Sequence, residues 1–191
     1  MDCVGEPEPL PSKDVVAGSA ASQQQRLDVL LQKSTARCLE AHYQQLQLAT
    51  EIASLDCYFS CCAPFFFRLS ERSRLQAGTL MDLTLAQGGS VKLPALAAPA
   101  RGLGVDRSET DRKLFTSLEA CLQIEASKNL DALSAEVFDF KNARLRKALE
   151  ALAAEGCEQQ EQLARLASSV LHGSSKHEEL AMFESGLRGR L

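Results

Sequence analysis

Aromatic residues are scarce in this 191-residue chain: they make up 5% of the sequence, and tryptophan is absent. The residues that recur instead are Leu, Ala, Gln and Glu, which are strong helix formers. Few segments have the alternating, β-branched pattern that is typical of strands. The length allows one domain with a real hydrophobic core. The composition therefore favours a single all-α domain with a tail.

An excess of positive charge and long apolar runs are also missing. The net charge is −4, so the sequence offers no basic surface typical of nucleic-acid binding. No run approaches the roughly 20 apolar residues that a membrane-spanning helix needs. The acidic, proline-rich start "MDCVGEPEPLPSKD" resembles neither a secretory signal nor a mitochondrial transit peptide. We therefore expect a cytoplasmic protein with neither nucleic acid nor membrane as a partner.

Familiar catalytic patterns are missing as well: the chain has no P-loop, no GxSxG and no HExxH motif. Its seven cysteines are an odd number without an export signal, which favours reduced thiols over disulfides. Cys57, Cys61 and Cys62 are close in sequence. They are either small apolar residues near a helix end or a thiolate metal site, but no His lies nearby to complete zinc-finger spacing.

Helical periodicity divides the chain into four long segments. We expect disorder in residues 1–21, a helix from Ser22 to about Cys62 where Pro64 interrupts, and a second helix over 65–87 that Gly88-Gly89 stops. A third helix is predicted to begin near Asp106 and to carry a stripe as far as Val137. A short break at "FDFKN" precedes a fourth, which "HGSS" at 172–175 closes. The predicted bundle spans 22–175, and residues 176–191 form a polar tail.

The connection between the second and third helices is unusually long and rich in glycine and proline, "GGSVKLPALAAPARGLGV". A connection of this length needs a reason in a compact domain. A crossover that runs the full length of a bundle and joins two parallel neighbouring helices supplies one. The fold prediction is thus an all-α four-helix bundle with one long crossover between helices 2 and 3.

Two polar residues interrupt the apolar stripe of the second helix. Leu69, Ser73, Gln76, Leu80 and Leu83 step by four, three, four and three, so Ser73 and Gln76 are expected to face the core. Glu125 lies on the stripe of the third helix in the same way. A buried Glu must find a partner or shift its pKa; Tyr58, Gln76 or a basic side chain are the candidates, and a bound metal ion is the alternative.

In this order of segments the sequence resembles ferritin. The resemblance is carried by "LMDLTLAQGGSVKL", "SLEACLQIEASKNLDAL", "EGCEQQEQLARLASSVL" and "FESGL", with a weaker match at "EIASLDCYFS". It covers Ser34 to Leu187, although the chain is about a dozen residues shorter than ferritin between its first two helices. Ferritins oxidise Fe(II) at a dinuclear site inside each bundle and store ferric iron in a multi-subunit shell. The resemblance implies this fold, ferric iron as the bound species and an oligomer of ferritin chains.

The resemblance also implies where the iron ligands would lie. Ser73 and Gln76 occupy the positions of a Glu-x-x-His pair, Cys157 that of a fourth-helix Gln, and Glu125 retains an inward Glu. A first-helix Glu falls on Glu51, or Gln47 stands there if the alignment is anchored earlier. Glu51 and Glu125 are therefore the candidate metal ligands, and Ser73, Gln76 and Cys157 are degenerate positions of the ferroxidase site.

The mineral-nucleating acidic cluster of ferritin light chains is reduced too. Its positions fall on Arg68, Glu71, Arg72 and Leu75, so only Glu71 remains, and cationic neighbours repel iron. We expect an iron-storage protein of the ferritin type without its own ferroxidase activity. Two alternatives remain: an interaction or regulatory subunit that co-assembles with active ferritin chains, and an enzyme with a relocated site at Glu51, Glu125 and Cys157.

Overall fold

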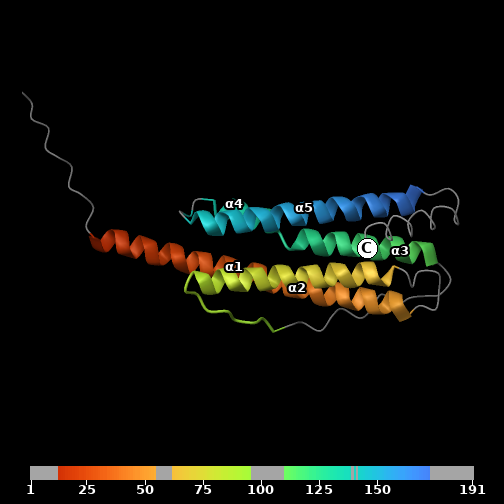
Figure 1. Ribbon diagram of the computed structural model, residues 1–191, viewed down its shortest axis with the longest axis horizontal. Helices are drawn as coiled ribbons and strands as arrows, with labels where there is room; N and C mark the ends of the chain where they lie inside the picture. The colour runs from red at the N-terminus through yellow and green to blue at the C-terminus, as the bar shows by residue number, and fades with distance from the viewer. Residues whose placement is uncertain (1–12, 55–61, 96–109, 139, 141, 173–191) are drawn as a thin grey trace, which may run out of the picture.

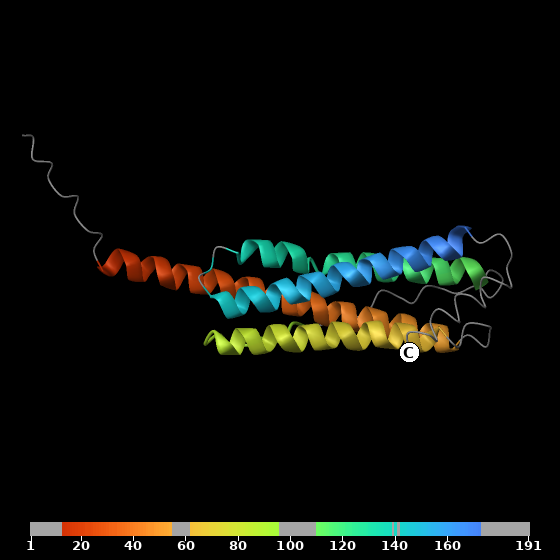
Figure 2. The same cartoon turned by 45° about the horizontal axis from the view of Figure 1, so that its top comes forward.

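The computed structural model describes residues 13–54, 62–95, 110–138, 140 and 142–172. These residues form five helices and no strand: α1 (Lys13–Ser54), α2 (Ala63–Ala86), α3 (Thr110–Ser127), α4 (Leu130–Glu136) and α5 (Ala143–His172). Helices α1 and α2 pack together along their length, and α5 packs against α3 and α4. Helices α3 and α4 follow one another along the bundle and together take the place of one long helix. The architecture is therefore a four-helix bundle (Figures 1 and 2).

The directions of the helices agree with the predicted crossover. In Figure 1, α2 and α3 run the same way along the bundle, whereas α1 and α5 run the opposite way. The end of α2 and the start of α3 therefore lie at opposite ends of the bundle. Residues 87–109 must bridge this distance, about 36 Å for a helix as long as α2. The prediction of one long crossover between two parallel helices is confirmed.

One predicted helix boundary was wrong. Helix α1 begins at Lys13 rather than Ser22, so residues 13–21 of the predicted disordered extension are helical. Pro11 is the last proline before the helix, and the Ala- and Gln-rich stretch after it continues the helical propensity. The predicted end near Cys62 adjoins residues 55–61, which lie outside the described ranges together with Cys57 and Cys61. Cys62 is the buried N-cap residue of α2.

The third predicted helix is broken in two. Asn129 adopts a left-handed conformation, with φ of 50°, and separates α3 from α4. Asparagine tolerates this conformation better than most residues with a side chain. The break before α5 is confirmed, and Asn142 caps α5 because its Oδ1 accepts a hydrogen bond from the Leu145 backbone N–H (3.1 Å).

Helix α2 ends in a turn that depends on Gly88. Gly88 has φ of 77°, and the next residue's N–H donates to the Thr84 carbonyl (3.0 Å), a helix-ending turn that favours glycine. Replacing Gly88 with Ala should lower the free energy of unfolding by about 1 kcal/mol, because an L side chain is strained at this φ. Urea unfolding measures the change; Gly78→Ala, at a glycine of α2 with open space around it, is the control and should not destabilise.

The buried residues divide into two hydrophobic clusters along the bundle. One lies where the second half of α1 meets the start of α2, the middle of α3 and the C-terminal part of α5. It includes Phe66, Leu118 and Leu163. The other gathers around the earlier part of α1, the later part of α2, α4 and the start of α5, and includes Leu31, Leu80 and Leu145. Between these two clusters in sequence lie buried polar residues, among them Gln45, Ser73, Gln76, Glu125 and Lys128.

Candidate functional site

Five buried polar side chains from three helices form a connected network, here called the polar layer: Gln45 of α1, Ser73 and Gln76 of α2, Glu125 of α3, and Lys128 directly after α3. Each is at most 2% exposed. Polar groups at such depth are costly unless they are paired. The contacts within the layer supply a partner to each of these side chains, although Gln76 Nε2 has none within the described residues. The geometry of the layer therefore decides which chemistry the interior of the bundle can support.

The Lys128 ammonium lies among the oxygens of this layer. Its Nζ donates to Gln76 Oε1 (2.7 Å) and to Ser73 Oγ (3.2 Å), and it forms an ion pair with Glu125 Oε2. An ammonium group has three protons to donate, and these three oxygens match that number. Lys128 is therefore fully coordinated by the polar layer.

The remaining bonds connect the layer to α1. Gln45 Nε2 donates to Glu125 Oε1 (2.5 Å), and Ser73 Oγ donates to Gln45 Oε1 (2.8 Å). Both oxygens of Glu125 thus have partners from different elements, one a neutral amide and one a cation. The layer contains one carboxylate and one ammonium, so the two formal charges cancel inside the bundle.

Backbone geometry explains how Lys128 reaches this position. It follows Glu125 by three residues, the spacing of neighbours on one helix face, and its N–H still bonds to the Glu125 carbonyl (3.2 Å). The left-handed residue Asn129 then redirects the chain. Because Lys128 lies at the C-terminal end of α3, its cation also complements the helix dipole.

The oxygens of the polar layer do not fit a pair of iron ions. Iron sites in helical bundles of the di-iron type use several carboxylates and imidazoles that project inward, whereas this layer has one carboxylate and no imidazole. The Lys128 cation lies among the same oxygens and would repel a metal dication. Within the described residues, no group of three or more His, Cys, Asp or Glu side chains is placed to hold a metal ion.

The structure places three of the candidate residues as the sequence suggested. Ser73, Gln76 and Glu125 are buried and face one another across α2 and α3. Of the partners considered for Glu125, a basic side chain, Lys128, forms an ion pair with it, and Tyr58 lies outside the described residues. Lys128 itself was missed, although its spacing of three from Glu125 was visible in the sequence.

The candidate residues of the first and fourth helices, Glu51 and Cys157, lie outside the polar layer. Cys157 is exposed, whereas Gln159, two residues later, is 1% exposed and is the polar residue that α5 turns inward. Glu51 is half-buried and accepts a hydrogen bond from Gln47 Nε2 on its own helix (2.8 Å). The residue of α1 that joins the polar layer is Gln45, which continues the stripe of Cys38, Ala41, Leu48 and Ile52 at helical spacing.

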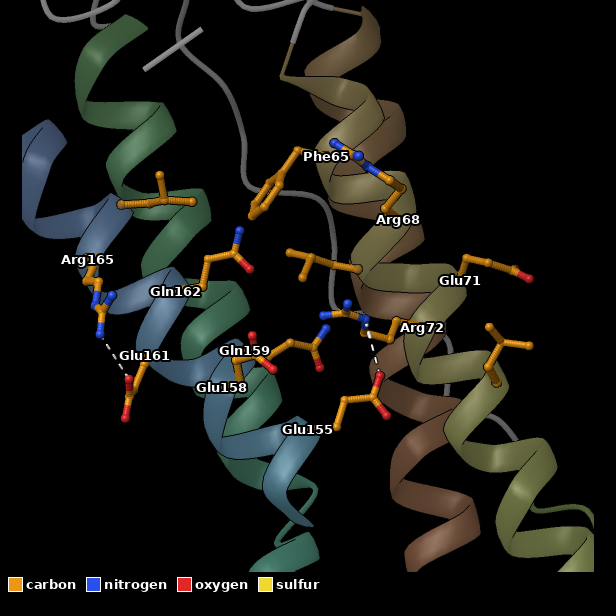
Figure 3. A pocket seen from close by; sticks show the side chains of 13 residues that line it. Phe65, Arg68, Glu71, Arg72, Glu155, Glu158, Gln159, Glu161, Gln162 and Arg165 are labelled. Carbon is orange, nitrogen blue, oxygen red and sulfur yellow. Dashed lines mark hydrogen bonds and ion pairs between the residues drawn. The ribbon is translucent and has the colours of Figure 1, made fainter. Parts of the chain in front are cut away.

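The predicted nucleation positions lie on a different surface, at a groove between α2 and α5 (Figure 3). Glu71 is exposed and its carboxylate accepts two hydrogen bonds from Arg74, at 2.8 and 2.5 Å. These bonds lower the pKa of Glu71 below its ordinary value. Arg72 forms an ion pair with Glu155 across the groove (3.2 Å). The carboxylate of Glu71, the one acidic residue retained at these positions, is therefore already paired with the Arg74 guanidinium group.

Two buried thiols adjoin the polar layer and give the fold a pH dependence. Burial raises the pKa of Cys38 to about 11, opposed by Lys128 and reinforced by Glu125, and burial together with Glu125 raises that of Cys121 to about 12. The ordinary value is 9.0. Above pH 9 the unfolded chain loses these protons first, so folding stability should fall as pH rises towards 11.

We expect each buried thiol to contribute a loss approaching 1.4 kcal/mol per pH unit, on the order of the linkage limit for one proton, between pH 9 and its folded pKa. The free energy of unfolding of Cys121→Ala should therefore fall less steeply over pH 9–10.5 than that of the wild type. Urea titrations at each pH measure the slopes. Cys157→Ala, at an exposed thiol, is the matched control and should keep the wild-type slope; equal slopes in all three proteins would contradict the prediction.

Comparison with known proteins shows the fold. No family model matches the sequence, and no curated protein matches it. Among solved structures, the ferritin of the multicellular green alga Ulva pertusa is similar with a TM-score of 0.72 and 23% identity, covering 85% of this chain and 83% of that one. The open pore ferritin of the hyperthermophilic archaeon Archaeoglobus fulgidus has a TM-score of 0.70 and 15% identity, covering 85% and 94%. The chain therefore has a ferritin-like four-helix bundle fold.

Proposed function

We propose that this chain is a ferritin-like subunit of cytosolic iron storage that does not oxidise iron itself and works beside catalytic ferritin chains. The observation that carries the proposal is the Lys128 ammonium, which is coordinated by Glu125, Gln76 and Ser73 inside the bundle. This arrangement stabilises the bundle interior without metal. Ferric iron is then the cargo of the assembly rather than a ligand of this interior.

The surface of α2 supports the same proposal. At the positions where a nucleating subunit would gather carboxylates, Arg68 and Arg72 are exposed and Glu71 is paired with Arg74. Two guanidinium groups and one paired carboxylate at these positions do not gather iron as a cluster of free carboxylates would. The enzyme with a relocated site receives less support, because Cys157 is exposed while Glu125 is buried. No described helix is long and apolar enough to cross a membrane.

The proposal is tested by loading iron with and without a catalytic partner. Purified chain is mixed with Fe(II) in air and desalted, and the iron retained per chain is measured together with the rate of oxidation. We expect oxidation at the rate of buffer and almost no retained iron. When the chain is refolded together with a catalytic ferritin chain, we expect both chains in one large particle by size-exclusion chromatography, with iron retained.

Two outcomes would contradict the proposal in different ways. Many irons retained per chain without a partner would show that the chain stores iron independently, so the reading of the polar layer as closed to iron would be wrong. Failure to enter the mixed particle, with no iron retained, would contradict a role in storage. The alternative of an interaction protein with no iron role would then stand.

A further inference from the structure

A groove of about 830 Å³ separates α2 from α5 on the surface of the bundle. Its floor is apolar, with Phe65, Leu69 and Leu166, and its walls are charged (Figure 3). Leu75 adds an apolar side chain at the rim that is 56% exposed. Carboxylates outnumber guanidinium groups by one among the residues that line it: Glu71, Glu155, Glu158 and Glu161 against Arg68, Arg72 and Arg165.

One residue of the floor indicates that the groove takes a polar partner. Gln159 lines the groove and is 1% exposed, yet neither its Nε2 nor its Oε1 has a hydrogen-bond partner within the described part of the chain. A buried amide without partners is destabilising, because it has lost its bonds to water without replacing them. The amide offers N–H donors and a carbonyl acceptor side by side, the complement of a peptide unit whose N–H and C=O are not used in a helix.

The position of the groove narrows the choice of occupant. Phe65, Gln162 and Arg165 lie at one end of it, and Arg72 and Glu155 at the other (Figure 3). Helix α5 continues from Arg165 to His172, so the chain after His172 starts beside the Phe65 end. Residues 87–95, in contrast, turn from α2 towards α1, and Gln32 Nε2 of α1 donates a hydrogen bond to the Ser90 carbonyl (2.8 Å). This segment lies on the side of α1 and α2 that is away from α5 (Figure 1).

We propose that the groove between α2 and α5 is the docking site for residues 180–191 of this same chain, "LAMFESGLRGRL". The inference is independent of the proposed iron-related function. The lining residues of α5 extend from Glu155 to Leu166, about 17 Å of helix. Seven residues, 173–179, connect α5 to the segment and reach at most about 25 Å, enough to return past the end of α5 to the groove.

The chemistry of the segment matches that of the groove. Phe183 and Leu187 supply apolar side chains for the floor, where their removal from water favours docking. Gly186 lets the backbone approach closely, so that its peptide groups bond to the Gln159 amide. Arg188 and Arg190 outnumber Glu184 among the charged side chains of the segment, and this excess of one positive charge complements the excess of one carboxylate in the groove.

Hydrogen–deuterium exchange of the full-length chain tests the docking. In the wild type, peptides from 180–191 should exchange at least about 10-fold more slowly than an unstructured peptide of the same sequence. Leu75→Glu in the groove wall and Phe183→Asp in the segment should each restore the rate of the unstructured peptide. Leu85→Glu is the matched control, because Leu85 is an equally exposed leucine of α2 (58%) that does not line the groove, and it should leave protection unchanged.

A second variant tests the amide independently of the groove wall. Gln159→Leu fills the same volume without hydrogen-bonding groups, so the fold is kept while exchange around Gly186 increases. Three results would overturn the proposal: exchange of wild-type 180–191 at the unstructured rate, protection that Leu75→Glu leaves intact, or protection that disappears on dilution. The last would assign the groove to a second copy of the chain.

Discussion

Replacing Lys128 with Met should lower the free energy of unfolding by about 3–5 kcal/mol, because it leaves the Glu125 carboxylate buried without its cation. Both side chains are almost fully inaccessible, at 1% and 0% exposed, so water cannot replace the lost partner. Ser73 and Gln76 lose a donor at the same time. Urea or guanidinium unfolding followed by circular dichroism measures the change.

A double variant distinguishes the cost of an unpaired buried carboxylate from the cost of lost packing. Lys128→Met/Glu125→Gln removes both charges and keeps the bond from Gln45, so most of the lost stability should return. Arg74→Met is the matched control: Arg74 also pairs with a Glu three residues away, but the two side chains are about half exposed, and the cost should stay below about 1 kcal/mol. Equal costs for Lys128→Met and Arg74→Met would contradict the structural role of the buried pair.

Restoring metal ligands should give a metal site only when Lys128 is removed. We expect Ser73→Glu/Gln76→His/Lys128→Ala to bind Co²⁺ or Fe²⁺ beside Glu125 at least on the order of 100-fold more tightly than Ser73→Glu/Gln76→His, a difference of about 2.7 kcal/mol. The physical reason is repulsion, since even two unit charges 4 Å apart interact by about 4 kcal/mol at an effective dielectric constant of 20.

The measurement is anaerobic calorimetry with Fe²⁺, or the visible absorption of bound Co²⁺. Glu125→Gln in the triple variant is the control and should weaken binding, because it removes the native carboxylate from the site. Equal affinity with and without Lys128 would show that the ammonium does not occupy the metal position, and the argument for a non-catalytic interior would lose its main support.

The sequence by itself determined the fold class and topology of this protein. Apolar stripes at helical spacing, the Gly88-Gly89 stop and the break near "FDFKN" are local signals, and they gave the order of the helices. The long link after α2 then required a crossover. These features depend on the propensity and periodicity of residues close together in the chain, so they can be predicted without knowledge of tertiary contacts. The same signals identified Ser73, Gln76 and Glu125 as inward polar residues.

The tertiary structure alone decided what those residues do. Lys128 reads in sequence as a charged residue near a helix end, and its burial beside Glu125 depends on how α3 ends at Asn129 and packs against α1 and α5. The predicted site residues Glu51 and Cys157 each lie less than two turns of helix from a glutamine that is buried instead, Gln45 and Gln159 respectively. Their orientation is set by the rotation of each helix against its neighbours. Local sequence does not encode that rotation, because it results from side chains packing across elements distant in the chain.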